Sequence, residues 1–280
     1  MKKNTLQAIL LVIILSISTF SFGQKLVKIK GSKVVTTTEI TLDSIVSLEL
    51  FKNIDLILTQ GDEDKLTIFA DDNLHDIVDV DLADGKLSLS LLNKISSKKK
   101  FELSLQLVNL EELIMNSNSK LSFTNHFKVN TIDITLNDKA HGELLFDAIE
   151  SITYTGNDKS KGDVSFKSEF ATFTLLDNAK IKGVSTLDEL KVETIDKATI
   201  ELSGKCETVL LDAKDSSNMK LTNLITDSTE ILATGKTTIR TNTTTDLLLD
   251  LKEASKIYFY GKAVVELKGF SGTATLFKKE

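Results

Sequence analysis

The sequence is poor in the residues on which most metal, redox and nucleophilic chemistry depends. Its 280 residues include no proline, no tryptophan, one cysteine, three histidines and a single arginine, Arg240. Zinc sites, iron–sulfur clusters, disulfide frameworks and arginine-based phosphate sites all require side chains that are scarce here. No P-loop, dinucleotide-binding or G-x-S-x-G motif occurs, so we expect no nucleotide partner and no cofactor.

The charge balance argues against a further class of partner. The chain has 40 acidic residues against 34 basic ones, which gives a formal net charge of −6. Nucleic-acid binding needs a basic surface, so we expect no nucleic acid as a partner. With 41% hydrophobic and 26% charged residues the chain has the composition of a folded protein, and its length allows one large domain or two modest ones.

Residues 1–23 are typical of a signal peptide. Two lysines precede an apolar run over residues 8–17, and Ser21 and Gly23 occupy the −3 and −1 positions of a cleavage site. The run is shorter than the roughly 20 residues that a membrane-spanning helix needs, and no second candidate follows. We therefore predict cleavage after Gly23, export to the periplasm or the outer cell surface, and no transmembrane segment after cleavage.

Residues 24–100 are predicted to form an N-terminal antiparallel β segment, because apolar and polar side chains alternate from about Val34 to Leu91. Residues 54–58 and 66–68 flank a turn and are predicted to pair as a hairpin. The dipeptide at 84–85, Asp-Gly, predicts a second hairpin. The basic stretch 93–100 is predicted to be a solvated loop that ends this N-terminal segment and cap.

From residue 101 onward the sequence repeats with a period of 19–20 residues. An acidic residue followed two positions later by Ala or Ser recurs at Asp138, Asp158, Asp177, Asp196 and Asp215. Weaker copies are anchored at Asn118, Ala233 and Glu253. Apolar residues recur four positions before and six positions after these anchors, so the copies form vertical columns of like residues.

This period favours one architecture. Helical repeats and propeller blades are longer, and the leucine-rich repeat frame is absent, which leaves a β-solenoid with one coil per copy. We therefore predict an all-β protein in which the antiparallel segment leads into a right-handed parallel β-helix over residues 101–280. The prediction is about seven or eight coils, and residues 24–280 are also compatible with one continuous domain.

The chain resembles a known family of exported proteins. The opening "FKNIDLILTQGDEDKLTIFADDNLHDIVDVDLADGKLSLSL" and the following "FELSLQLVNLEELIMNSNSKLSF" are similar to the domain described as putative auto-transporter adhesin, head GIN type, common in secreted Bacteroidetes proteins. The resemblance covers roughly residues 44–269 and implies a β-solenoid, an exported location and an adhesin-like role. This sequence departs from the family in using Asp-x-Ala/Ser where glycine-rich turns are common, and in lacking a translocator barrel.

The Asp column is the one constellation that invites a chemical interpretation. Stacked about 4.8 Å apart, its carboxylates repel one another, so something must offset that repulsion. The interpretation we favour is a structural turn ladder, in which each Asp accepts backbone N–H bonds at a solenoid corner. The alternatives are an exposed face paired with Lys139, Lys159 and Lys197, and a Ca²⁺ site. Even spacing from the apolar columns predicts that the carboxylates face inward, unless the corner resets the alternation.

We therefore expect a non-enzymatic interaction module of the cell envelope that presents flat solenoid faces to an unknown protein or polysaccharide. The alternative is a carbohydrate-active β-helix enzyme, a polysaccharide lyase or hydrolase, with Arg240 as the base in an acidic groove. A third interpretation is a purely structural envelope protein. The three histidines show no metal-ligand spacing, and Cys206 is interpreted as a small buried hydrophobic residue.

Overall fold

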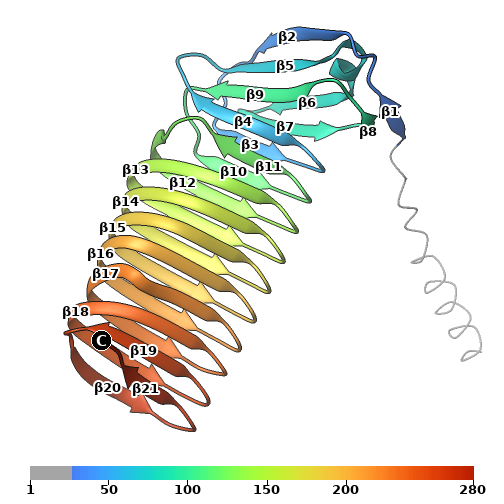
Figure 1. Ribbon diagram of the computed structural model, residues 1–280. Helices are drawn as coiled ribbons and strands as arrows, with labels where there is room; N and C mark the ends of the chain where they lie inside the picture. The colour runs from blue at the N-terminus through green and yellow to red at the C-terminus, as the bar shows by residue number, and fades with distance from the viewer. Residues whose placement is uncertain (1–26) are drawn as a thin grey trace, which may run out of the picture.

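The computed structural model describes residues 27–280, which form an elongated β-solenoid with additional strands at its N-terminal end (Figure 1). Apart from one 3-10 helix at Asp72–Ile77, every element of these residues is a β-strand. No helix in this part of the chain is long and apolar enough to cross a membrane. The predicted signal peptide, residues 1–23, lies outside the described residues.

The coils stack by parallel pairing between successive turns of the chain, which confirms the predicted parallel β-solenoid. There are about nine turns, more than the seven or eight expected. The strands of the coils are β3 (Ser47–Leu50), β4 (Asp55–Gln60), β7 (Lys86–Leu91), β9 (Phe101–Leu107), β10 (Glu112–Met115), β11 (Lys120–Phe123), β12 (Phe127–Leu136), β13 (His141–Gly156), β14 (Lys161–Leu175), β15 (Lys180–Thr194), β16 (Thr199–Ala213), β17 (Asn218–Ala233), β18 (Thr238–Leu251), β19 (Lys256–Gly261), β20 (Val264–Phe270) and β21 (Thr275–Lys278).

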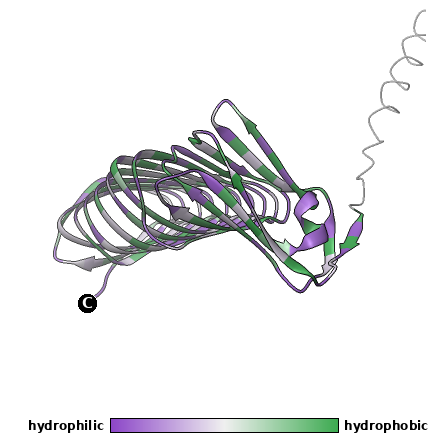
Figure 2. Cartoon of the chain, turned by 90° about the horizontal axis from the view of Figure 1, so that it is seen from above, coloured by the Kyte–Doolittle hydropathy of each residue, from purple (hydrophilic) through white to green (hydrophobic). Residues whose placement is uncertain are grey.

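Each coil contributes one strand segment to each of two opposite faces. Face A consists of β7, β3, β10, the C-terminal halves of β12 to β18, and β20. Face B consists of β9, β4, β11 with the first residues of β12, the N-terminal halves of β13 to β18, and β19 and β21. Hydrophobic and hydrophilic residues alternate along the strands, as Figure 2 shows, so the apolar ones of both faces fill the space between them.

The core columns have the predicted spacing through the middle of the solenoid. Ile134, Tyr154, Phe173, Val192 and Leu211 occupy one register position on successive coils, and all are buried. Rings on successive coils pack against each other, with Tyr154 and Phe173 meeting edge to face at a centroid distance of 6.0 Å. Because each coil repeats the same inward position, the core is a continuous column, and fully burying each large apolar side chain contributes about 1.5–3 kcal/mol.

The N-terminal part of the chain is a mixed sheet in which strands of different origin are interleaved. β5 (Lys65–Asp71) pairs antiparallel with β9, and β2 (Val35–Thr41) pairs antiparallel with β5. The hairpin predicted between residues 54–58 and 66–68 is wrong, because β9 lies between β4 and β5 and supplies the buried Leu103 and Leu105 to the core. A strand from later in the chain thus takes the place that local sequence assigns to a neighbour.

The second predicted hairpin is confirmed. β6 (Val78–Ala83) and β7 pair antiparallel around Asp84 and Gly85, whose φ angles of 51° and 76° suit a type I′ turn. The stretch 93–100 is not only a loop, because it contains β8 (Lys94–Ser97), which pairs with β1 (Lys28–Lys30). Parallel coil pairing begins at β3, before the predicted division at residue 101, and the domain boundaries themselves stay a prediction.

The coils turn at one edge through a repeated tight corner. At each corner one residue has positive φ, and these residues are Lys52, Ser117, Asp138, Asp158, Asp177, Asp196, Asp215, Gly235, Glu253 and Gly272. In most corners the carbonyl of the residue just before the positive-φ residue accepts the N–H of the residue three positions further along the chain, as Asn137 does from the Ala140 N–H at 3.0 Å. Positive φ at the first central residue alone is the sign pattern of a type II′ turn. The residue two positions after each of these is buried, so the side chain there must be compact in most coils.

The structure corrects two anchors and the predicted direction of the carboxylates. The weaker copies turn at Ser117 and Gly235, instead of Asn118 and Ala233, so Ile239 stacks on Met219 instead of Leu221. All five Asp residues of the column are exposed instead of facing inward, because the corner resets the alternation of the strands. Their positive φ, not an inward carboxylate, is what the position requires.

The corner geometry predicts how substitutions at Asp177 change stability. Asp177→Val should lower the free energy of unfolding by about 1–2 kcal/mol, because a left-handed conformation is costly for a β-branched residue, whereas Asp177→Gly should change it little. The matched control is Asn178→Val at the next, equally exposed position, where φ is not positive. Thermal or urea unfolding measures all three variants, with and without Ca²⁺. A Ca²⁺-dependent rise in the melting temperature that Asp177→Asn abolishes would contradict the ladder interpretation.

A buried carboxylate holds the N-terminal end together. Asp71, the last residue of β5, is fully buried and accepts three backbone N–H bonds, from Lys33 at 3.1 Å, Lys99 at 3.0 Å and Lys100 at 2.9 Å. Burial alone raises the pKa of this carboxyl, but the three donors outweigh it and lower the pKa below its ordinary value of 3.8. A Cβ on Gly31 would lie 2.1 Å from an Asp71 oxygen, so only glycine fits beside it.

This arrangement predicts a pH-dependent contribution to stability. Because the folded-state pKa of Asp71 is lowered, its contribution is present above pH 3.8 and is lost as the pH falls through the lower, folded-state value. Asp71→Asn should therefore unfold more easily at neutral pH and lose this part of the acid dependence, as urea titrations across that range measure. Asp81→Asn, at an exposed position of β6, is the control. Equal acid sensitivity of Asp71→Asn and the unsubstituted chain would refute the assignment.

Candidate functional site

The corner carboxylates do not converge on a shared centre. The Asp138 carboxylate accepts the Ser117 N–H at 2.8 Å, and the Asp158 carboxylate lies 3.4 Å from the Asp138 N–H, so these two bond to the preceding coil. The five residues are Asp138, Asp158, Asp177, Asp196 and Asp215, and none forms an ion pair within 4 Å in the described part of the chain. No group of three or more His, Cys, Asp or Glu residues is arranged for a metal ion there. The turn-ladder and metal roles of the column both stay hypotheses.

The outer surface of face B carries a column of charged residues that the sequence analysis missed. In register on successive coils stand Glu143, Asp163, Lys182, Glu201, Lys220, Arg240, Tyr258 and Phe277. Asp163 pairs with Lys182 at 3.3 Å, and Glu201 pairs with Lys220 at 3.2 Å. Each is the fifth residue after a corner residue, so counting from the corners would have revealed the column.

The column ends in a cation–aromatic stack near the C-terminal end of the described chain. The Arg240 guanidinium lies 5.0 Å from the centroid of the Tyr258 ring. Tyr258 and Phe277 stack with centroids 5.2 Å apart and an interplanar angle of 18°, and Lys279 lies over both rings. Arg240 and Phe277 flank the Tyr258 ring on its two neighbouring strands, so the stack continues the column of face B to β21.

A shallow groove of about 640 Å³ runs beside this column. Its residues include Ser165, Gly183, Val184, Ser203 and Asn223 together with the charged column from Glu143 to Arg240. Gly183, at φ 156°, lines the groove in register with Val164 and Leu202, and a Cβ there would lie 1.9 Å from the Val164 carbonyl oxygen. The backbone conformation at this point of the groove therefore requires glycine.

The groove does not have the arrangement expected of the enzyme alternative. Arg240 lies at its edge against Tyr258, and two of its carboxylates, on Asp163 and Glu201, are already paired with lysines. Asp163 has a further partner, because its Oδ2 lies 3.0 Å from the Nε2 atom of His141. Burial raises the pKa of the Cys206 thiol to about 12, so this buried side chain is a protonated hydrophobe at neutral pH, as predicted.

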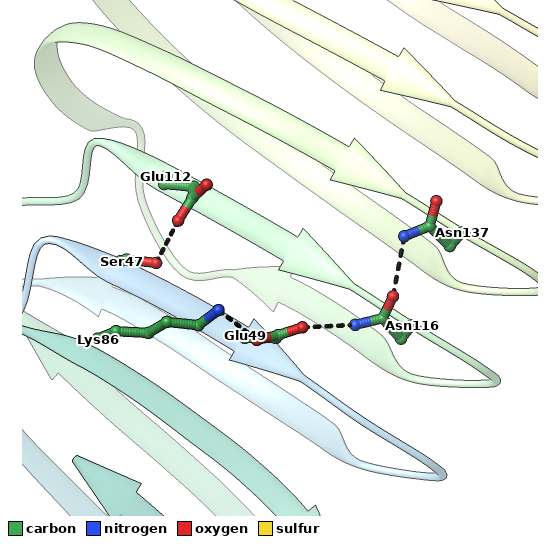
Figure 3. A network of polar contacts seen from close by, with 6 residues as sticks. All are labelled: Ser47, Glu49, Lys86, Glu112, Asn116 and Asn137. Carbon is green, nitrogen blue, oxygen red and sulfur yellow. Dashed lines mark hydrogen bonds and ion pairs between the residues drawn. The ribbon is translucent and has the colours of Figure 1, made fainter. Parts of the chain in front are cut away.

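Face A carries a group of polar contacts that includes two carboxylates, Glu49 and Glu112 (Figure 3). Glu49 pairs with Lys86 at 2.5 Å and accepts the Asn116 amide at 3.1 Å, while Ser47 donates to Glu112 at 2.6 Å. Asn116, Asn137 and Asn157 each lie just before a corner, and their side chains form a ladder. The Asn137 amide donates to the Asn116 side-chain oxygen at 2.8 Å, and the Asn157 amide donates to the Asn137 side-chain oxygen at 2.7 Å. These contacts link β7 and β3 to the coils beyond them, so the network connects the N-terminal strands to the solenoid.

Comparisons with known proteins agree with this architecture. The chain resembles the crystal structures of a putative adhesin from Parabacteroides merdae (TM-score 0.62, 19% identity, 90% of this chain and 99% of that chain) and of a putative lipid binding protein from Parabacteroides distasonis (0.65, 16%, 90% and 100%). A putative adhesin from Parabacteroides distasonis is also similar (0.60, 16%, 90% and 100%). At these identities the likeness establishes the fold alone. No curated protein matches the chain.

The family comparison extends across the coils and the interleaved N-terminal strands. The model of the family described as putative auto-transporter adhesin, head GIN domain, matches residues 46–263, from the start of the first parallel coil to the turn before β20. That range contains the corners from Lys52 to Glu253, face B from β4 to β19, and the groove. The chain therefore belongs to the putative auto-transporter adhesin, head GIN domain family.

Proposed function

We propose that the chain is a non-enzymatic, adhesin-like module, exported to the periplasm or the outer cell surface, which binds an extended protein or polysaccharide along face B. The observation that carries this proposal is the outer column of face B, in which charged and aromatic side chains repeat once per coil beside a shallow groove. Membership of the adhesin family supports the same role.

The repeat suits an extended partner. Side chains at one register position of successive coils lie about 4.8 Å apart, so a polymer lying along the solenoid axis meets a new contact at each coil. Individually weak contacts add up in this arrangement because each one raises the effective concentration of the next. Lys182, Lys220 and Arg240 offer donors, and Glu143 and Glu201 offer acceptors, so the surface suits a polar partner with groups of both kinds.

Charge reversal on face B tests the proposal. Xylan, polygalacturonate and collagen are each immobilised on a surface, and the affinity of the chain from residue 24 for each is measured. The probe bound with the highest affinity is then used to compare the variants. Lys220→Glu should weaken binding about tenfold or more, which corresponds to roughly 1.4 kcal/mol. Because the Lys220–Glu201 pair is exposed, the free energy of unfolding should change by less than about 1 kcal/mol.

Two controls separate the competing interpretations. Lys191→Glu makes the same charge change on the exposed surface of face A, and an equal loss of binding there would refute a role for face B. The size of the bound polysaccharide is followed by gel filtration, and its shortening would favour the lyase or hydrolase. If the protein bound none of the three probes, the result would contradict the proposal as stated and favour the purely structural role.

A further inference from the structure

Lysines gather at the N-terminal end of the solenoid from two distant parts of the chain. Residues 27–34 and 92–102 contain Lys28, Lys30, Lys33, Lys94, Lys98, Lys99 and Lys100, with Glu102 as their one acidic residue. This concentration stands out in a chain whose net charge is −6. We name these seven lysines the basic end.

The fold holds the two segments together by two sets of contacts. β1 and β8 pair in parallel and place Lys28 directly beside Lys94 (Figure 1). The buried Asp71 carboxylate accepts the backbone N–H groups of Lys33, Lys99 and Lys100, which brings these three residues to one point. The lysines are thus concentrated by specific tertiary structure and not only by a run in the sequence.

The seven lysines of the basic end outnumber the exposed acids beside them, Asp55, Asp72 and Glu102. Of the seven lysines only Lys100 forms an ion pair within 4 Å in the described residues, with Glu102 at 2.7 Å, and residues 1–26 contain no acid. Asp71 is fully buried against backbone donors, and the exposed Asp72 accepts the Ser32 hydroxyl and forms no ion pair within 4 Å in the described residues. Neighbouring like charges such as Lys28 and Lys94 disfavour the pairing of a short two-stranded sheet, so the arrangement does not serve folding.

Exposed apolar side chains accompany these lysines. Val27 is 68% exposed, and its carbonyl accepts the Lys94 N–H at 3.0 Å, while Leu92, two positions before Lys94, is 49% exposed. Phe69 is 39% exposed and lies 5.1 Å, ring centroid to Nζ, from Lys100. Basic groups interspersed with apolar ones match the boundary of a bilayer, where phosphates lie above acyl chains, better than a fully hydrated polyanion.

We propose that the basic end binds the surface of an anionic phospholipid bilayer. The lysine ammonium groups contact lipid phosphates, and Val27 and Leu92 reach the headgroup–acyl boundary. Binding at this end leaves the groove on face B uncovered, because that groove lies several coils away, over β13 to β18. The inference is therefore independent of what face B binds.

Vesicle sedimentation tests the proposal with the chain from residue 24, which lacks the apolar leader and retains every described residue. The protein should sediment with vesicles of equal parts phosphatidylglycerol and phosphatidylcholine, and not with phosphatidylcholine alone, and added salt should weaken binding. Each lysine near the surface is worth about fivefold in affinity, so the triple variant Lys28→Gln/Lys94→Gln/Lys98→Gln should bind on the order of a hundredfold more weakly. The matched control, Lys139→Gln/Lys159→Gln/Lys197→Gln at exposed corner positions, should bind as the unsubstituted chain does.

The absence of tryptophan supplies a second readout that separates a bilayer from a soluble polyanion. Leu92→Trp introduces a single tryptophan, whose emission should shift to the blue with the anionic vesicles and not with heparin. Ile149→Trp, at a 68% exposed position between the two halves of β13, should show no shift. Circular dichroism confirms that each variant is folded. Unchanged vesicle binding of the triple variant, equal losses in both triple variants, or an equal blue shift with heparin would each overturn the proposal.

Discussion

The structure depends on the corner turn, because every coil must reverse at the same place for the backbones to stay in register. Neighbouring corners are hydrogen-bonded to each other. The residue that follows the positive-φ residue of one coil donates its N–H to the carbonyl of the positive-φ residue in the preceding coil, as Lys159 does to Asp138 at 2.8 Å and Lys197 to Asp177 at 2.7 Å. Variation in coil length is absorbed elsewhere. The ladder shifts register between Val129 and Thr131 and between Leu221 and Ile225, on the strands and away from these corners. Fixed corners with adjustable strands let the sequence drift without losing the stack.

The stacking of aligned coils fixes the chemistry of the surface as well as that of the core. Any outward position is repeated about every 4.8 Å, so the two faces present columns of side chains instead of a single pocket. This explains how a chain with three histidines, one arginine and no tryptophan can still carry a specific surface. Specificity then resides in the order of charges and rings along a column, as in the sequence from Glu143 to Phe277 on face B. The groove that runs beside this column adds shape to the surface.

The sequence was informative where a physical requirement recurs and misleading where partners are distant. The period, the core column through Tyr154 and Phe173, and the Asp84–Gly85 turn follow from local rules and are present in the structure. Choosing anchors by acidity misplaced two corners, since the position requires positive φ, which Ser117 and Gly235 also adopt. The insertion of β9 between β4 and β5 could not be predicted from the sequence, because no local sequence feature determines which strand occupies a given position in a sheet. The basic stretch 93–100 looked like a solvated loop because neither β1 nor Asp71 is near it in sequence.

The two ends of the described stack handle their exposed backbone groups differently. At the N-terminal end, β5 and β6 run antiparallel to the strands they cover and β2 adds a further strand, so the parallel coils do not present their own edge there. At the other end β20 and β21 each pair with one strand of the preceding coil. β20 carries Glu266 and Lys268, and its pairing with β18 shifts register next to Asp250. Charges and irregular pairing are how sheet edges resist adding further strands. A solenoid whose coils bind one another by general backbone bonding needs such devices, because the same bonding would otherwise extend it without limit.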